Sequence, residues 1–451
     1  MPKPPFFATI LIAMAMAGGV FAQNERPLSL DEALHLAREQ GYQMEIARGK
    51  VGEARGENTA AWKGFLPQVT LEEQYIDSDD PVAVFGMKLR QGVFAASDFD
   101  IAALNSPESF ENYATQVQVN LPLLNLDAIW GKLAAGKMLA AQKAGLQRTG
   151  EQVDLMVRAL YFGLTLAREQ VRTYQDALQS VSQFRDNARL AFEQGIINRA
   201  DYLAMEVRVL ELQQGLLEAQ NNLAGVNENL RLVMAIEDEV NFLPTDSLSL
   251  PAAPETAGIT LNEERPDLLA ARYKKQAAGY ANWAAKGSWL PRLNGFGNWQ
   301  WHGAEAFASD SENRTLGLSL SWNIFDGLGN LGRNMQSSAR YNMAKTAFEM
   351  TRQQAHNELA AAQRKVAVSR QQIELGQTAV VQARESVRLT EQRFRQGLEN
   401  TADLLAREAS LTRARLTYLK ALYDYNIALH ELNFASGQNA FAAQNNDKGD
   451  R

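Results

Sequence analysis

Two long stretches without proline constrain the fold of this chain most. There is no proline between Leu123 and Leu243, and none follows Pro291. Because proline breaks helix interiors, its absence permits very long helices. A single helix over residues 127–194 would be on the order of 100 Å long at 1.5 Å per residue. Such a length favours a long bundle or tube over a compact domain.

Apolar residues recur in both stretches at steps of three, four and seven. The first half contains two such runs, one of Leu203, Val207, Leu210 and Leu217 and a second of Leu223, Val226, Leu230 and Val233. In the second half the run consists of Leu404, Leu411, Tyr418, Leu422, Tyr425, Leu429 and Leu432. This spacing predicts helices that pair in the manner of coiled coils.

The N-terminus and the composition indicate export. Residues 1–22 read as a signal peptide, with Lys3 before an apolar run and small residues, Val20 and Ala22, before the expected cut. The chain has no cysteine, so stability must come from packing or assembly. The net charge of −7 argues against a nucleic-acid partner. Residues 438–451 are expected to form a disordered tail.

Four segments alternate between apolar and polar residues, at about 67–77, 113–122, 292–302 and 315–325. The third contains aromatic residues of the kind that favour membrane interfaces, such as Trp299. Strands of a membrane barrel fit this pattern, and so does a half-buried sheet in a soluble protein. Four strands cannot close a barrel, because the smallest have about eight. A barrel would therefore require several copies of the chain.

An internal repeat organises the chain. The segment Phe192–Glu206 returns as Phe394–Glu408, with phenylalanine, glycine and Ala-Asp at one spacing. Each half is predicted to run helix, strand, strand, long helix, glycine turn and helix. The predicted first repeat covers 23–243, and a linker at 244–266 joins it to a second repeat at 267–437.

Proline and glycine mark the junctions within each repeat. Pro67 and Pro291 each follow a leucine and are predicted to end a helix and open a strand. Gly195 and Gly397 lie between helical stretches, where glycine commonly ends a helix in a left-handed conformation.

The chain resembles the TolC family of outer-membrane efflux proteins over essentially its whole mature length. The resemblance rests on the opening segment 28–34, the Leu-Pro pairs, the segment 121–124 and the duplicated Phe-x-x-Gly and Ala-Asp turn. It implies a mainly α-helical fold with membrane β-strands. Three identical subunits would each give four strands to one twelve-stranded barrel in outer-membrane lipid, and the helices would continue it through the periplasm.

The resemblance also implies a function. A channel of this family passively conducts substrates that an inner-membrane pump and a periplasmic adaptor protein deliver, and it carries no cofactor. The substrate stays open among drugs, metal ions and proteins. A periplasmic structural or adaptor-type coiled-coil protein is the alternative.

The turns are the candidate site. Near a helix start, Asp201 and Asp403 complement the helix dipole, whereas in an oligomer they could also form a ring that attracts cations. The resemblance implies that they line the aperture of the periplasmic tip, which Gly195, Gly397, Phe192 and Phe394 would build. The chain departs from some relatives, with Glu399 in place of a basic residue and Ala406 in place of a second aspartate. Arg395 and Arg199 are candidates for alternative ion pairs.

Enzyme and metal motifs have weaker support. Residues 327–332 match G-x-G-x-x-G, but the preceding segment alternates and no strand follows to complete a βαβ unit. The four histidines lack ligand spacing, and no G-x-S-x-G or cysteine nucleophile is present. Acidic residues gather in the first long loop, where a solvated loop is favoured over a cation site. They are Asp77, Asp79, Asp80, Asp98 and Asp100. The sequence thus predicts neither a catalytic nor a metal site.

Overall fold

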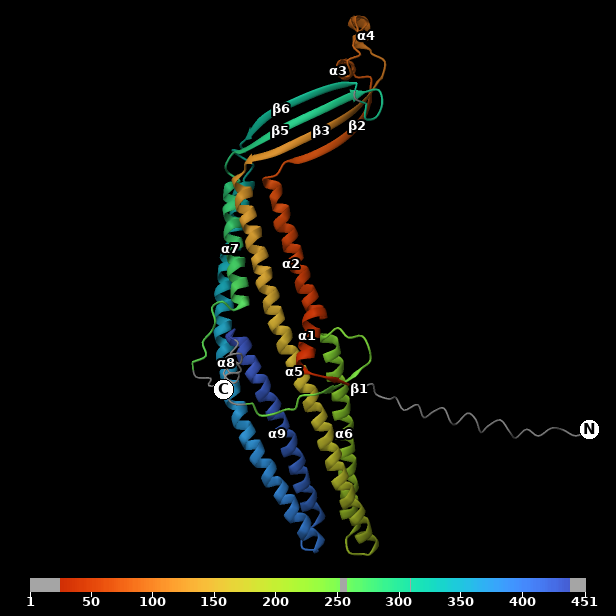
Figure 1. Cartoon of the computed structure of the whole chain (residues 1–451), viewed down its shortest axis with the longest axis vertical. Coiled ribbons are helices and arrows are strands. Elements are labelled where there is room, and N and C mark those ends of the chain that lie inside the picture. The colour runs from red at the N-terminus through yellow and green to blue at the C-terminus, as the bar shows by residue number, and fades with distance from the viewer. Residues whose placement is uncertain (1–24, 252–257, 309, 439–451) are drawn as a thin grey trace, which may run out of the picture. The chain divides into compact units, whose positions relative to one another are not determined.

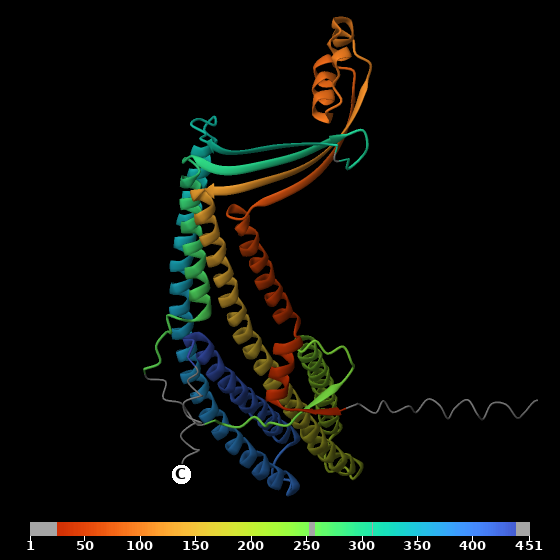
Figure 2. The same ribbon diagram turned by 45° about the horizontal axis from the view of Figure 1, so that its top comes forward.

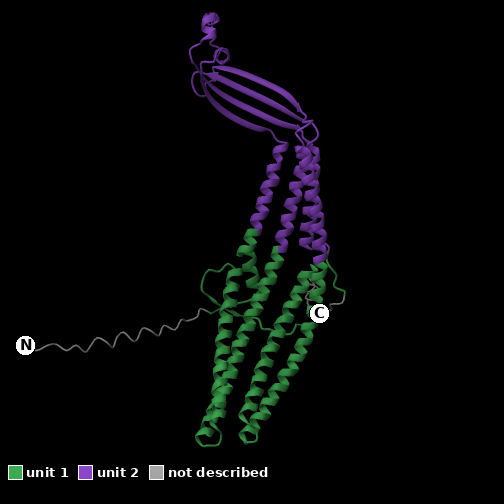
Figure 3. Cartoon of the chain, turned by 180° about the vertical axis from the view of Figure 1, so that it is seen from behind, with its two compact units in different colours: residues 1–46, 149–262, 355–451 green, residues 47–148, 263–354 purple. Residues whose placement is uncertain are grey.

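The computed structural model describes residues 25–251, 258–308 and 310–438, which divide into two compact units (Figure 3). Unit 1 comprises the described residues up to 46 together with 149–262 and those from 355 onward. Unit 2 comprises 47–148 and 263–354. Each unit therefore draws on both halves of the sequence. The predicted signal peptide and nearly all of the predicted tail lie outside the described residues.

Two very long helices confirm the prediction from proline spacing (Figure 1). Helix α5 covers Leu126–Glu193 in 68 residues, and α8 covers Gly329–Arg395 in 67 residues. Each is followed by a turn and a returning helix, α6 (Arg199–Val233) after α5 and α9 (Thr401–Ser436) after α8. The order of elements predicted from the repeat is thus present in both halves.

A short parallel sheet in unit 1 was not predicted. Strand β1 (Glu25–Leu28) precedes α1 (Leu30–Gln40) and pairs with β4 (Asn241–Pro244), which lies across the predicted start of the linker. Asn227 of α6 anchors β4, because its amide donates to the Val240 carbonyl at 2.8 Å and accepts from the Phe242 amide at 2.9 Å. The Tyr161 hydroxyl of α5 donates to the Leu28 carbonyl at 2.9 Å.

The predicted apolar stripes differ in their outcome. On α9 the stripe is confirmed, since most of its members are buried, including Leu404, Leu422 and Tyr425. On α6 the first four positions of the stripe are not buried within this chain. Leu203, Val207, Leu210 and Leu217 are 43–66% exposed, whereas Met205, Val209, Leu212 and Ala219 face inward. The inward face of α6 is set by packing against Ala177 and Val181 of α5, which the helical spacing alone does not identify.

Unit 2 holds one antiparallel sheet in the order β2-β3-β5-β6 (Figure 2). The chain reaches β2 (Gln68–Ser78) through α2 (Tyr42–Ala60) and the short turn Ala61–Gly64. It returns along β3 (Phe110–Leu124). Helix α7 (Pro266–Gly287) leads into β5 (Arg292–Gly303) and β6 (Ser311–Ser321). Pro67 and Pro291 directly precede β2 and β5, as predicted.

The predicted bounds of the last strand, 315–325, are wrong. Strand β6 begins and ends four residues earlier, at Ser311 and Ser321. Its partner β5 starts only at Arg292, which pairs with Ser321, so the backbone from Trp322 onward has no strand beside it. The Trp322 indole instead donates to the Trp289 carbonyl at 3.0 Å.

The acidic segment between β2 and β3 is largely exposed to solvent, and it contains short helices that were not predicted. It contains α3 (Pro81–Gln91), a single turn at Ala96–Phe99 and α4 (Ile101–Asn105), drawn beyond the strand ends in Figures 1 and 2. Asp80 and Asp100 are N-caps that accept from backbone amides at 2.8 Å, and Asp98 pairs with Lys88 at 2.8 Å. Helix capping therefore accounts for Asp80 and Asp100, and the ion pair with Lys88 accounts for Asp98.

Candidate functional site

The two helix turns are nearly identical in backbone conformation. Gly195 has φ +72° and Gly397 has φ +73°, the left-handed region predicted for both. The Gly195 amide donates to the Phe192 carbonyl at 2.9 Å, and the Gly397 amide donates to the Phe394 carbonyl at 3.0 Å. Residues with a Cβ rarely adopt this conformation, which explains why glycine stands at both positions.

Asp201 and Asp403 both lie in the first turn of the returning helix. Asn198 caps α6 by accepting from the Asp201 amide at 2.9 Å, and Asn400 caps α9 by accepting from the Asp403 amide at 2.8 Å. The Asn400 amide also donates to the Asp403 carboxylate at 2.7 Å. Both aspartates are partly exposed, so each combines a favourable dipole position with a carboxylate that solvent can reach.

The predicted tip aromatics have different surroundings. Phe394 packs against a small core in which Ala188, Met205 and Leu404 are buried. Phe192 instead stacks on Tyr202, with ring centroids 5.8 Å apart and an interplanar angle of 9°. The two turns thus share a backbone but differ in side-chain packing.

Ion pairs at the turns involve other partners than the aspartates. Arg393 donates to Glu399 at 2.9 Å, and Arg395 pairs with Glu391 one turn earlier. Within the described part of the chain, Arg199 forms no ion pair. The departure at Glu399 therefore gives the α8–α9 turn an internal ion pair.

A nearly buried ion pair that sequence reasoning missed joins the two repeats. Arg208 of α6 donates to Glu408 of α9 at 3.1 Å, and the Thr412 hydroxyl donates to the other carboxylate oxygen at 2.7 Å. The Glu408 side chain is 5% exposed. The repeat carried no signal for this pair, because Ser410 stands where the second half would repeat Arg208.

The sheet in unit 2 has one apolar and one mainly polar face. Strand pairing places these side chains on the apolar face: Val69, Leu71, Val117, Val119, Leu121, Trp299, Leu316, Leu318 and Leu320. Toward the strand ends that adjoin the β2–β3 segment, the same face also carries Glu73, Thr115, Glu312 and Arg314. The opposite face carries Thr70, Gln116, Gln118, Asn120, Asn298, Gln300, Thr315 and Ser319, with Phe296 as an aromatic exception. Large side chains on the apolar face, such as Leu318 at 71%, are strongly exposed. This arrangement is typical of a strand set with lipid on one side and water on the other.

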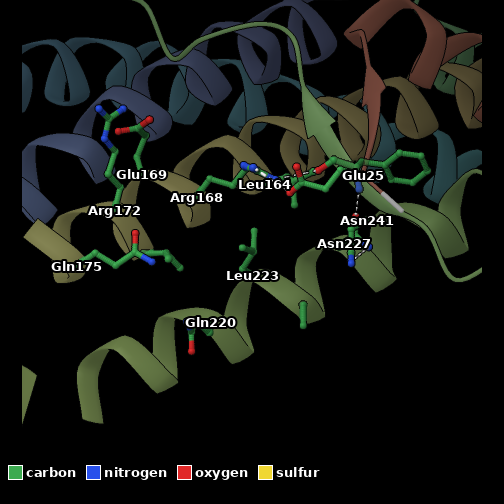
Figure 4. Close-up of a pocket in the computed structure, with 13 residues that line it drawn as sticks. Glu25, Leu164, Arg168, Glu169, Arg172, Gln175, Gln220, Leu223, Asn227 and Asn241 are labelled. Atoms are coloured by element: carbon green, nitrogen blue, oxygen red, sulfur yellow. Dashed lines mark hydrogen bonds and ion pairs between the residues drawn. The ribbon is translucent and has the colours of Figure 1, made fainter. Parts of the chain in front are cut away.

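A cavity of about 860 Å³ lies in unit 1, between α5 and α6 beside β4 (Figure 4). Its wall is mostly polar, with Arg168, Gln175 and Gln220, and Leu164 and Leu223 also line it. Arg168 reaches Glu25 at 3.3 Å and the Phe242 carbonyl at 3.5 Å. These contacts hold β1 and β4 to α5, so we assign them to the fold.

Other candidate features add no further site. The strand before the G-x-G-x-x-G segment is antiparallel, and Gly329 opens α8. Among the described residues, no three histidine or acidic side chains lie close enough to hold a metal ion. Over the same residues, none of the helices combines the length and apolar character needed to cross a bilayer.

The fold and the two-faced sheet define a mainly α-helical protein with membrane β-strands. The family model for outer membrane efflux proteins matches residues 260–438. Outer membrane protein OprJ of Pseudomonas aeruginosa is 26% identical over 325 residues, which are 67% of this chain and 65% of OprJ. The alignment thus spans slightly less than two thirds of that relative.

Solved structures share the fold. The CmeC outer membrane channel of Campylobacter jejuni matches with a TM-score of 0.79 and 14% identity, over 93% of this chain and 89% of CmeC. The MtrE outer membrane channel of Neisseria gonorrhoeae, in its open state, matches with a TM-score of 0.73 and 17% identity, over 91% of this chain and 89% of MtrE. The C-terminal part of the chain thus matches the outer membrane efflux protein family, and the whole described chain shares its fold with solved outer membrane channels.

Proposed function

We propose that the chain is the outer-membrane exit duct of a tripartite efflux system. Three copies form one barrel, and the helices conduct substrate passively from an inner-membrane pump and a periplasmic adaptor protein. The observation that carries the proposal is the four-stranded sheet, which exposes leucines on one face and amides on the other. A soluble adaptor of the coiled-coil type would gain nothing from that exposed apolar face, so this alternative is not favoured.

The edges of the sheet support assembly. Strands β2 and β6 are its two edges, and each has 11 residues. Unpaired backbone groups in lipid cost several kcal/mol each, so a membrane sheet must close. Strand directions alternate across the sheet, which makes β6 antiparallel to the β2 of a neighbouring copy. Three copies give a closed ring of twelve strands, the number that the TolC resemblance implies.

The exposed stripe on α6 offers a second contact surface between copies. Leu203, Val207, Leu210 and Leu217 follow one another at steps of four, three and seven. On α8, Val368, Leu375 and Leu389 are also exposed at multiples of seven residues. Heptad spacing on exposed helices is typical of surfaces that pack against further helices. Both stripes are therefore candidates for burial when the trimer forms.

The experiment that tests the duct is reconstitution. The mature protein is purified in detergent, its mass is determined in the detergent complex, and it is added to planar bilayers. We expect a trimer that needs detergent and forms discrete conducting channels. A mature protein that stays monomeric and soluble without detergent contradicts the proposal.

Asp201 and Asp403 are proposed to line the periplasmic aperture, and their removal gives the second test. In a trimer they form six carboxylates near one axis, which concentrate negative potential at a narrow opening. In the double variant D201N/D403N we expect cation selectivity to fall and block by divalent cations to weaken by about tenfold. The substitution to asparagine keeps the size of each side chain.

The control is Glu228→Gln, which removes an exposed acid of α6 far from the turn in sequence. It should leave selectivity unchanged. Equal selectivity of D201N/D403N and the original channel would remove the two aspartates from the aperture and leave them as helix caps.

A further inference from the structure

The C-terminal end of helix α3 packs on the polar face of the sheet, at the strand ends that carry the β2–β3 segment. Asn112 lies four residues before Gln116 on β3, and His302 lies two residues after Gln300 on β5. Residues an even number apart on a strand share a face, so all four side chains belong to the polar face. Asn112 and His302 are each only 2% exposed, whereas Gln116 and Gln300 are partly exposed. The covering element is α3, which packs against β3, β5 and β6.

Gln91, the last residue of α3, fixes the helix to this face. Its amide nitrogen lies 2.9 Å from the Glu111 carbonyl, 3.1 Å from the Asn112 side-chain oxygen and 3.1 Å from the Gly303 carbonyl. Asn112 in turn lies 3.3 Å from Nδ1 of His302. Gln91 therefore bonds to both central strands at once, and its bonds to Asn112 and Gly303 are buried, where a hydrogen bond is stronger than in water.

The outward face of α3 is apolar. Val84, Met87 and Gln91 are its buried residues. A helix turns by about 100° per residue, which places Val82 and Leu89 on the opposite side. Their side chains are exposed by 80% and 51%.

The segment around α3 has a small core of its own. Phe94 makes edge-to-face contacts with Phe85 at 4.9 Å and with Phe99 at 5.2 Å between ring centroids. Lys88 and Asp98 form an ion pair across the same segment. These contacts, together with the N-cap at Asp80, hold α3 as part of a folded unit rather than a loose loop.

We propose that α3 is a constriction inside the outer mouth of the barrel. The inference rests on the proposed three-copy channel, in which the polar face becomes the lumen. Three α3 helices then project from the wall, and their Val82 and Leu89 side chains point toward the axis. Narrow apolar rings lose water and obstruct the passage of hydrophilic solutes. The solutes excluded are bulky hydrophilic molecules that approach from outside the cell.

Single cysteines test the constriction, because the chain has none of its own. Ser319→Cys places a thiol on the luminal face, and its labelling on intact cells by a polyethylene-glycol maleimide reports access through the outer mouth. We expect slow labelling with α3 intact, and labelling about tenfold faster when Gln91→Ala frees the helix. The surface variant V82S/L89S, which does not disturb the buried contacts of α3, should also increase the labelling rate of S319C.

The control is Ile101→Ser, an exposed apolar residue of α4 that should leave the labelling rate unchanged. The constriction is overturned if labelling is fast with α3 intact, or if Q91A and V82S/L89S match the control. Leu318→Cys separates this result from failure of the channel itself. If the small reagent N-ethylmaleimide labels L318C and S319C at equal rates, the sheet does not divide lipid from lumen and the proposed function fails.

Discussion

A chain carrying Leu318→Arg is expected to be missing from the outer membrane as an assembled trimer. Leu318 is the central one of three leucines that β6 places on the apolar face of the sheet, where a barrel contacts lipid. An arginine at the bilayer midplane of a barrel costs about 2–4 kcal/mol, and three copies multiply that cost. The measurement is the amount of folded, detergent-resistant trimer in outer-membrane fractions.

The neighbouring Ser319→Arg is the matched control. Ser319 is on the same strand but on the polar face, so its arginine would extend into water. We expect normal assembly and a change confined to ion selectivity. If both variants assemble equally well, the apolar face is not in contact with lipid.

Removing Arg208 is expected to have the largest effect on the helices of unit 1. Arg208→Ala leaves the Glu408 carboxylate buried, with Thr412 as its remaining hydrogen-bond donor. Breaking a buried ion pair in this way costs roughly 3–5 kcal/mol. We expect a clear fall in the thermal unfolding midpoint of the purified protein, followed by circular dichroism at 222 nm, a wavelength that reports helix content.

Two further variants show whether loss of the Arg208–Glu408 ion pair is the cause of the lower unfolding midpoint. Arg388→Ala breaks an exposed pair with Glu385 on α8, and solvent screening makes the contribution of such a pair to stability small. The double variant R208M/E408M replaces both charges by apolar side chains and should recover most of the lost stability. An R208A midpoint equal to that of R388A would show that Glu408 is not dependent on Arg208.

The sequence predicted the secondary structure well where the signal was local. The absence of proline predicted α5 and α8, and the Leu-Pro pairs predicted the starts of β2 and β5 to within one residue. The end of β6 was misjudged, because a strand needs a partner and the partner's start lies on another segment. Strands β1 and β4 were missed for the same reason, since each has four residues and pairs across more than 200 positions.

The candidate site was predictable in part. The repeat identified both glycine turns, whose left-handed conformation is local and needs no tertiary information. The same repeat could not reveal Arg208 with Glu408, which lie on different helices and break the internal symmetry. The sequence also did not predict the helices of the acidic segment, because Asp80 and Asp100 can be recognised as caps only when α3 and α4 are known.

The two open edges of the sheet also predict how a defective subunit affects intact subunits made in the same cell. If β2 of each copy pairs only with β6 of another, a single defective subunit prevents closure of any barrel that contains it. With equal amounts of original and L318R subunits mixed at random, about one in eight trimers would be free of the variant. A plasmid-borne L318R gene is therefore expected to act as a dominant inhibitor of efflux in cells that keep an intact chromosomal copy.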